Sequence, residues 1–255
     1  MNGQVPRLRM FAGPNGSGKS SIQAVIGREL LGVYINPDDI EKEIRERGDA
    51  LDLRAYGVNT TAAEILPFFL NSTLLKQADL LDEAAELRFN DDHLSFFAVS
   101  VNSYFASVAA DFIRHKLLET RTSFTFETVM SSADKVAFLA KARAQGFRIY
   151  LYYIATEDPV INISRVRHRV KMGGHPVPED KIVSRYHRSL ALIMDAVQLT
   201  DRAYLFDNTG HECIWLAEVT DGRLLEMKTT QMPQWFKRGL WDKFAAKQIG
   251  SPSDT

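Results

Sequence analysis

The sequence has little cysteine and no long apolar run. Its single cysteine, Cys213, cannot form an internal disulfide, and its apolar neighbourhood predicts a buried structural thiol and not a reactive one. No segment approaches the roughly 20 apolar residues that a membrane helix needs. The first ten residues also lack the apolar stretch of a secretion signal. We therefore expect a cytoplasmic protein with no membrane contact.

The sequence also lacks an excess of charge of either sign. It has 31 Lys and Arg against 32 Asp and Glu, which gives a net charge of −1 over 255 residues. The chain therefore has no overall positive charge that would attract a polyanion, and a nucleic acid is not an expected partner. With 45% hydrophobic and 25% charged residues, the chain has the composition of a globular protein, and we expect a single domain over residues 1–255.

A phosphate-binding pattern stands near the start of the chain. It is Gly-x4-Gly-Lys-Ser, formed by Gly13, Pro14, Asn15, Gly16, Ser17, Gly18, Lys19 and Ser20. Small residues let the backbone wrap a phosphate, while Lys19 adds positive charge and the Ser20 hydroxyl ligates Mg²⁺. The pattern follows a predicted strand at 8–12 and precedes a predicted helix, as the motif requires. It predicts binding of ATP with Mg²⁺, and we place Ser21 in the same site.

Short apolar runs predict the strands of an α/β fold. They lie at 8–12, 32–36, 123–126, 147–154 and 203–206, separated by segments with helical spacing. We therefore predict a P-loop NTPase with a parallel sheet of about five strands flanked by helices. A C-terminal β-hairpin is expected around Asp221-Gly222, a residue pair suited to a type I′ turn.

The segment 48–111 has apolar residues at helical spacings and no strand pattern. We interpret it as a helical insertion on the acceptor side of the site. A long helix is expected at 104–118.

Carboxylates that follow the predicted strands are candidate catalytic groups, because ligands of open α/β sheets collect at the carboxyl ends of strands. Asp38 follows the second strand and could take a proton from an acceptor hydroxyl, although it or Asp39 could simply favour the start of a helix. Glu127 ends the third strand and is a candidate acid on the magnesium or substrate side. Asp111 alone would pass as a solvated charge.

Residues 159–190 predict a basic helical hairpin. Seven Lys or Arg lie between 165 and 188, against the two acids Glu179 and Asp180. Arginines that close over transferring phosphoryl oxygens would stabilise their charge and exclude water, so we interpret the hairpin as a lid. A solvated basic face or a polyanion patch are the alternatives. Residues 207–209, including Asn208, follow the fifth strand where such folds place the adenine.

Together these motifs resemble the zeta-toxin family of P-loop kinases. The resemblance is carried by residues 12–20, by Ile35-Asn36-Pro37-Asp38, by Phe126-Glu127-Thr128 and by the basic block 165–188. It implies a core like that of nucleoside-monophosphate kinases and phosphorylation of the 3′-hydroxyl of UDP-N-acetylglucosamine.

The resemblance also implies roles for single residues. It makes Lys19 the phosphate-loop lysine, Asp38 the base and Arg169 a lid arginine, with Asp111 and Glu127 on the acceptor. Thr128 follows Glu127 and is placed with the acceptor residues. A toxin role would imply a separate antitoxin protein as partner.

Three features depart from the family pattern. His175 falls near the place of a second lid arginine, a role that Arg185 could take, and both Thr128-Val129-Met130 and the insertion differ from the toxins. The acceptor could therefore be another small molecule, such as an antibiotic or a nucleotide. An RNA end is a further alternative, suggested only by the basic hairpin.

A switch or motor ATPase is a further alternative of another class. The chain lacks a Leu-Ser-Gly-Gly signature, and its third strand ends in one acid without the Asp-Glu pair of such motors. It also lacks the Asn-Lys-x-Asp motif of GTP switches. These absences favour an ATP-dependent kinase that acts on a small-molecule hydroxyl.

Overall fold

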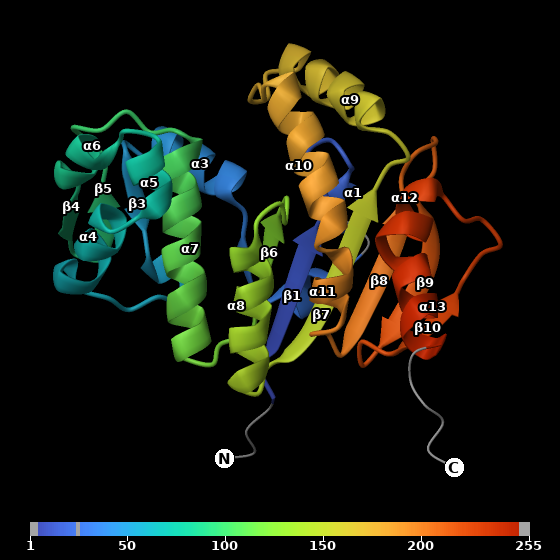
Figure 1. Ribbon diagram of the computed structural model, residues 1–255. Coiled ribbons are helices and arrows are strands. Elements are labelled where there is room, and N and C mark those ends of the chain that lie inside the picture. The colour runs from blue at the N-terminus through green and yellow to red at the C-terminus, as the bar shows by residue number, and fades with distance from the viewer. Residues whose placement is uncertain (1–4, 24–25, 250–255) are drawn as a thin grey trace. The chain divides into compact units, whose positions relative to one another are not determined.

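A computed structural model describes residues 5–23 and 26–249 of the chain. The chain divides into two compact units (Figure 1). The first combines Met1–Gly27 with Thr128–Thr255, and the second is Arg28–Glu127. The predicted insertion 48–111 lies inside the second unit.

The first unit is built on five neighbouring strands in the order β10-β9-β8-β7-β1. β1, β7 and β8 run parallel, with Met10 opposite Leu151 and Leu151 opposite Ala203. These three residues share one face of the sheet and are fully buried, and so is Phe11 on the opposite face, as expected for strands covered on both faces. The strands are β1 (Arg7–Ala12), β7 (Arg148–Ala155), β8 (Arg202–Asp207), β9 (Ile214–Thr220) and β10 (Leu224–Met227).

Helices of the first unit pack on this sheet. Figure 1 shows α8, α10 and α11 lying along the same face of the strands, and both α8 and α11 contact β7. The helices are α1 (Lys19–Gln23), α8 (Ala133–Ala144), α9 (Pro159–Lys171), α10 (Glu179–Ala191), α11 (Ile193–Val197), α12 (Gln234–Phe236), a π-helical turn (Lys237–Trp241) and α13 (Asp242–Ile249).

The predicted C-terminal hairpin is present as the antiparallel pair β9 and β10. Asp221 and Gly222 have φ values of 52° and 63°, and the Arg223 N–H donates to the Thr220 carbonyl at 3.0 Å. Positive φ at both central residues is the mark of the type I′ turn expected from the sequence.

The second unit contains the parallel pair β2 and β6, with Ile35 opposite Phe126. The long helix α7 contacts α3 and β2, and its buried face includes Phe105, Phe112 and Ile113. The elements are α2 (Arg28–Leu31), β2 (Val33–Ile35), α3 (Pro37–Glu46), β3 (Ala50–Asp52), a 3₁₀ turn (Arg54–Tyr56), α4 (Ala62–Leu70), α5 (Thr73–Gln77), α6 (Leu81–Ala85), β4 (Arg88–Asn90), β5 (His93–Ser95), α7 (Ser103–Glu119) and β6 (Phe124–Thr128).

The fold is mixed α/β with mainly parallel strands flanked by helices, as the sequence predicts. The strand number differs: the five of the first unit and the pair β2 and β6 make seven, where about five are expected. The two additional strands are β9 and β10, which were expected as a C-terminal hairpin and not as part of the sheet. β9 pairs antiparallel with β8, so the hairpin extends the sheet.

The insertion contains a small sheet that the helical pattern does not predict. β3, β5 and β4 form three antiparallel strands of three residues each. Strands this short show no measurable alternation, and the turn between β4 and β5 uses Asp91 and Asp92 at positive φ.

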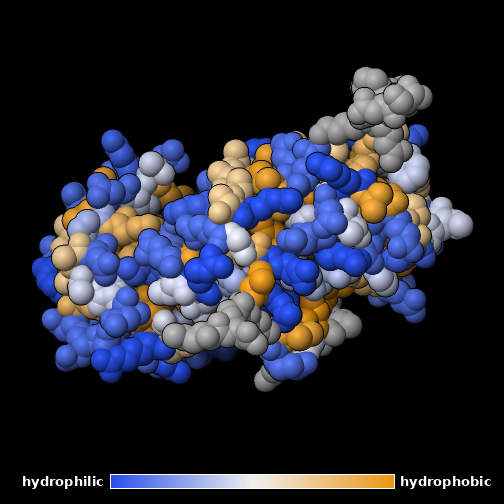
Figure 2. Space-filling view, turned by 90° about the horizontal axis from the view of Figure 1, so that it is seen from below, coloured by the Kyte–Doolittle hydropathy of each residue, from blue (hydrophilic) through white to orange (hydrophobic). Residues whose placement is uncertain are grey.

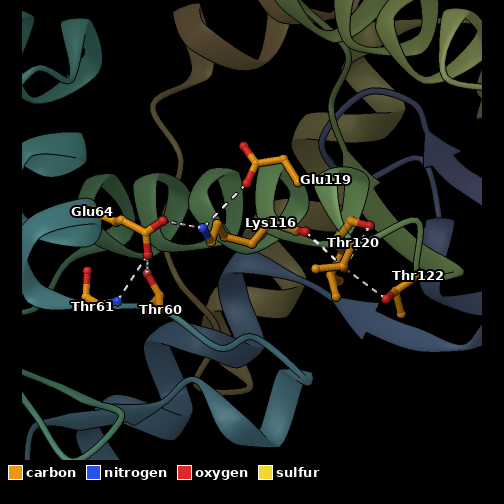
Figure 3. A network of polar contacts seen from close by, with 8 residues as sticks. Thr60, Thr61, Glu64, Lys116, Glu119, Thr120 and Thr122 are labelled. Atoms are coloured by element: carbon orange, nitrogen blue, oxygen red, sulfur yellow. Dashed lines mark hydrogen bonds and ion pairs between the residues drawn. The ribbon is translucent and has the colours of Figure 1, made fainter.

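A polar network fastens α4 to α7 within the second unit (Figure 3). Thr61 caps α4, and the Glu64 carboxylate accepts hydrogen bonds from the Thr61 N–H and the Thr60 hydroxyl. Lys116 of α7 donates to the same carboxylate at 2.9 Å and also pairs with Glu119. One lysine thus joins the start of α4 to the last turn of α7.

Hydrophilic residues predominate on the face seen in Figure 2, with hydrophobic residues interspersed. Among the described residues, no helix has the length and apolar character to cross a bilayer. Cys213, expected to be buried, is only half-buried, because it lies in the loop before β9 and not in the apolar strand that follows.

Candidate active site

The phosphate loop follows β1 in the first unit and bends sharply at its glycines. Gly13, Gly16 and Gly18 have φ values of 148°, 76° and 95°, which disfavour any residue with a side chain. A Cβ on Gly13 would collide with the Ile154 carbonyl of the neighbouring strand. The loop therefore needs glycine for its backbone angles and, at Gly13, for its packing.

Lys19 folds back over the loop. Its Nζ donates to the carbonyls of Gly13 at 2.9 Å and Pro14 at 3.2 Å. The ammonium group is thus held beside the segment whose N–H groups the motif turns toward a phosphate. This geometry fits an anion drawn in by backbone donors and a fixed positive charge.

The residues at the end of the loop fit a magnesium-bound nucleotide. Ser20 and Ser21 are exposed, and the buried Ser17 hydroxyl has no hydrogen-bond partner among the described residues. Nowhere in the described chain do three or more His, Cys, Asp or Glu residues gather as a metal site. Mg²⁺ commonly binds through substrate phosphates and few protein ligands, so the Ser20 hydroxyl would hold it here.

The arginines of the predicted lid hairpin have distinct contacts within the first unit. Arg185 of α10 donates to the Asn15 side chain of the loop at 3.4 Å. Arg169 of α9 donates to the His175 carbonyl, which is 3.2 Å away at the tip of the predicted lid. This contact lies within the hairpin. Arg167 instead pairs with Glu179 and ties α9 to α10. Arg185 thus connects the hairpin to the phosphate loop.

The segment after β8 also reaches the phosphate loop. The Asn208 side chain donates to the Ser17 carbonyl at 2.8 Å. Arg165 of α9 donates to the Gly210 carbonyl at 3.2 Å. The structure therefore brings the predicted adenine region, the lid and the phosphate loop together in the first unit.

Asp38 lies in the second unit, in the first turn of α3. Asn36 caps this helix by accepting a hydrogen bond from the Asp38 N–H at 3.0 Å, and Pro37 occupies the first helical position. The Asp38 side chain is exposed. Asp39 is exposed as well. Partial desolvation, followed by the neighbouring charge of Asp38, raises the pKa of Asp39 above its ordinary value.

Glu127 is buried and is bound by a tyrosine that the sequence analysis did not single out. The Tyr34 hydroxyl of β2 donates to Glu127 Oε1. Burial, reinforced by the Glu127 charge, raises the pKa of Tyr34 far above its ordinary value, so the phenol keeps its proton and donates. Tyr34 is opposite Thr125 in the parallel register, and Glu127 lies two residues farther along β6 on the same face of the sheet, within reach of the phenol. Only the pairing of the two strands could have revealed this contact.

Asp111 lies on α7 and pairs with Arg114 one turn later, with His115 Nε2 3.9 Å away. The Arg114 guanidinium lies 4.7 Å from the centre of the Phe126 ring, directly before Glu127. Arg114 is buried and therefore links Asp111 to β6. Asp111 is thus not merely a solvated charge.

Thr128 is the last residue of β6, and its side chain stabilises the turn that follows the strand. Its hydroxyl accepts from the Met130 N–H at 3.0 Å, and its carbonyl accepts from the Gly13 N–H at 3.3 Å. The residue therefore supports the start of the phosphate loop.

Residues 95–220 match the Zeta toxin family. The matched stretch contains Asp111, Glu127 and both helices of the predicted lid, α9 and α10. The resemblance to the zeta-toxin kinases predicted from the sequence is thereby confirmed, and it supports a kinase function that involves a nucleotide.

A relative from Haemophilus influenzae, an uncharacterized protein, is 27% identical over 108 residues, which are 41% of this chain and 77% of the relative. Two solved structures share the fold. The native AvrRxo1-ORF1:-ORF2 complex aligns with a TM-score of 0.53, and the same complex with ATP aligns with 0.51. Both are 14% identical to this chain and cover 98–99% of it and 67% of the aligned chain.

Proposed function

We propose that this chain, similar to the zeta-toxin kinases over residues 95–220, transfers the γ-phosphoryl group of ATP to a hydroxyl of a small molecule. The observation that carries the proposal is the glycine-dependent conformation of the phosphate loop. Lys19 folds over this loop, and Arg185 donates a hydrogen bond to the side chain of Asn15 in it. The AvrRxo1-ORF1:-ORF2 structure with ATP supports ATP as the donor. The first candidate acceptor is a nucleotide-sugar such as UDP-N-acetylglucosamine.

In this proposal each residue has a defined task. Residues 13–21 bind the phosphates, and the Ser20 hydroxyl would hold Mg²⁺, which would neutralise phosphate charge. Lys19, Arg169 and Arg185 stabilise the negative charge that spreads over the transferring group. The Asp38 carboxylate takes the proton from the attacking hydroxyl. Asp111, Glu127 and Thr128 belong to the acceptor side, and Asn208 to the nucleotide side.

A partner protein is also proposed. AvrRxo1-ORF1 was solved in complex with a second protein, AvrRxo1-ORF2. We infer that a separate protein of antitoxin type binds this chain and blocks its ATP site. Co-expression with candidate proteins, followed by measurement of ATP turnover in the purified complex, tests this part alone.

The kinase assignment is tested by incubating the protein with Mg·ATP and a panel of nucleotide-sugars and reading phosphorylated products by mass spectrometry. Asp38→Asn should reduce the rate by about 100-fold or more, since general-base catalysis contributes about that much. Lys19→Ala should reduce it by about 100-fold as well, because it removes a charge that stabilises the transferring phosphoryl group. Asp39→Asn is the matched control beside Asp38 and should retain activity.

The alternatives give different results in this assay. A wild-type rate for Asp38→Asn would refute the proposed base, and loss of activity only in Asp39→Asn would transfer the role to its neighbour. Steady hydrolysis of ATP that ignores every acceptor would instead indicate a switch or motor ATPase. Phosphorylation of an antibiotic, a free nucleotide or an RNA end would keep the kinase and change the acceptor.

A further inference from the structure

Two asparagines from distant parts of the chain hold two carbonyls of the phosphate loop. Asn162 of α9 donates through Nδ2 to the Asn15 carbonyl at 2.6 Å, across 147 positions of sequence. Asn208, after β8, donates through Nδ2 to the Ser17 carbonyl at 2.8 Å, across 191 positions. Both contacts lie within the first unit. The loop is therefore fixed from outside at two alternate peptide groups.

The orientation of the Asn162 amide follows from its second contact. The Thr156 hydroxyl donates to Asn162 Oδ1, which leaves Nδ2 to donate to the loop. Asn162 is fully buried, so an unmade hydrogen bond at this position would be costly. The pair of contacts therefore specifies asparagine, which has both an acceptor and a donor at one end.

Fixing a carbonyl also fixes the direction of the following N–H. In a planar trans peptide the C=O and N–H point in opposite directions. Holding the carbonyls of Asn15 and Ser17 on the asparagines turns the N–H groups of Gly16 and Gly18 the other way. Neither of these N–H groups donates to a residue that the structure describes. They are thus available to an anion.

The glycines at these positions also leave space for the two asparagines. A Cβ on Gly16 would lie 2.6 Å from the Asn162 carbonyl oxygen. A Cβ on Gly18 would collide with the Asn208 side-chain nitrogen. The glycine pattern of the loop therefore gives each asparagine room to approach.

We infer that Asn162 and Asn208 are positioning residues of the nucleotide site, which aim the Gly16 and Gly18 N–H groups at the phosphates by holding the preceding carbonyls. The inference rests on the proposed function in taking a nucleotide phosphate as the ligand. Asn208, which was expected near the adenine, would thus also hold the phosphate loop. Asn162 would connect α9 to the same loop.

The test compares Asn162→Ala and Asn208→Ala with Asn71→Ala. Asn71 makes the same kind of bond, from Nδ2 to the Pro67 carbonyl at 2.9 Å, at the end of α4. Binding of a non-hydrolysable Mg·ATP analogue is measured by calorimetry, and the melting temperature is measured without nucleotide. Each loop variant should bind the analogue about tenfold more weakly, by the worth of one well-placed hydrogen bond, while Asn71→Ala binds as wild type.

A second readout separates positioning from general loosening of the fold. In wild type, the amide proton resonances of Gly16 and Gly18 should move downfield when the analogue binds. The Gly16 shift should be reduced in Asn162→Ala and the Gly18 shift in Asn208→Ala. If Asn162→Ala does not fold, the half-exposed Asn208 carries the same comparison.

The two failures are distinguishable. A wild-type protein that binds no analogue overturns the proposed function itself. A wild-type protein that binds, with both variants binding equally well and showing the same glycine shifts, overturns the role of the asparagines and leaves the kinase proposal standing.

Discussion

The indole Nε1 of Trp235 donates a hydrogen bond of 2.7 Å to Asp207 Oδ1 inside the first unit. Both residues are buried, and Asp207 also accepts from the Thr209 N–H and hydroxyl. Asp207 directly precedes Asn208, which holds the phosphate loop. This buried pair thus helps to anchor the C-terminal segment next to Asn208.

Trp235→Phe should destabilise the protein by about 1–3 kcal/mol, because the buried Asp207 carboxylate loses a donor and the pocket loses volume. The change is measured as a shift of the urea unfolding midpoint. Trp241→Phe removes the same atoms from a half-buried position and should cost less. Equal midpoints for the two variants would show that the hydrogen bond to Asp207 contributes nothing.

Gly16→Ala and Gly48→Ala form a matched pair, with φ values of 76° and 74°. A Cβ at Gly16 meets the Asn162 backbone, whereas one at Gly48 meets nothing within 4 Å. Gly48→Ala should therefore show only the left-handed strain of about 1–2 kcal/mol. Gly16→Ala should show this strain and also lose binding of Mg·ATP, measured by calorimetry. Nucleotide binding that survives in Gly16→Ala would show that the loop tolerates the displacement.

Elements with a strong local pattern could be predicted from the sequence. The strand expected at 147–154 is found at Arg148–Ala155, and the helix expected at 104–118 is found at Ser103–Glu119. The phosphate loop is also found where its motif places it. In these segments the periodicity of apolar residues and the glycine pattern agree with the tertiary structure.

Contacts between distant segments could not be predicted in the same way. Nothing near Asn162 in the sequence distinguishes it from any other helical asparagine, because its partner Asn15 lies 147 positions earlier. From the sequence alone Tyr34 is predicted only to be a strand residue. The pairing of β2 with β6 is what brings its hydroxyl within hydrogen-bonding distance of Glu127. Side-chain partners of this kind depend on the pairing of strands, which a single sequence does not specify.

The Glu64–Lys116 contact predicts how stability varies with pH. The hydrogen bond from Lys116 is the largest cause that lowers the pKa of the exposed Glu64 carboxylate. Because folding lowers this pKa, the contact stabilises the fold at every pH above the ordinary pKa of a carboxyl group. The stabilisation disappears as the pH falls through the lower pKa of the folded state. The difference in urea midpoint between wild type and Lys116→Met should therefore shrink from pH 7 toward pH 3.

The same contact acts in the opposite sense at alkaline pH. The hydrogen bond to Glu64 raises the pKa of Lys116. The stabilisation of the fold by this contact is therefore complete below the ordinary lysine pKa of about 10.4, and it is lost as the pH rises through the higher pKa of the folded state. Lys42→Met is the control, because the Lys42–Glu46 pair is 3.7 Å apart and mostly exposed. A pH dependence in Lys116→Met equal to that of Lys42→Met would contradict the assignment.

Cys213 should be a slow thiol. Burial, followed by the charge of Asp207, raises the pKa of the thiol, whereas Arg165 lowers it. Since the thiolate is the reactive form, alkylation by iodoacetamide at pH 8 should be slower in the folded protein than in the protein unfolded by urea.

Arg165 offers a test of the electrostatic part of this effect. Arg165→Gln removes the charge that favours the thiolate, so alkylation of Cys213 should slow further. Arg167→Gln removes an arginine whose charge is engaged by Glu179, and it should leave the rate unchanged. A folded-state rate that matches the unfolded rate would show that the thiol is not shielded. Equal rates in the two arginine variants would show that access to the sulfur, and not charge, limits the reaction.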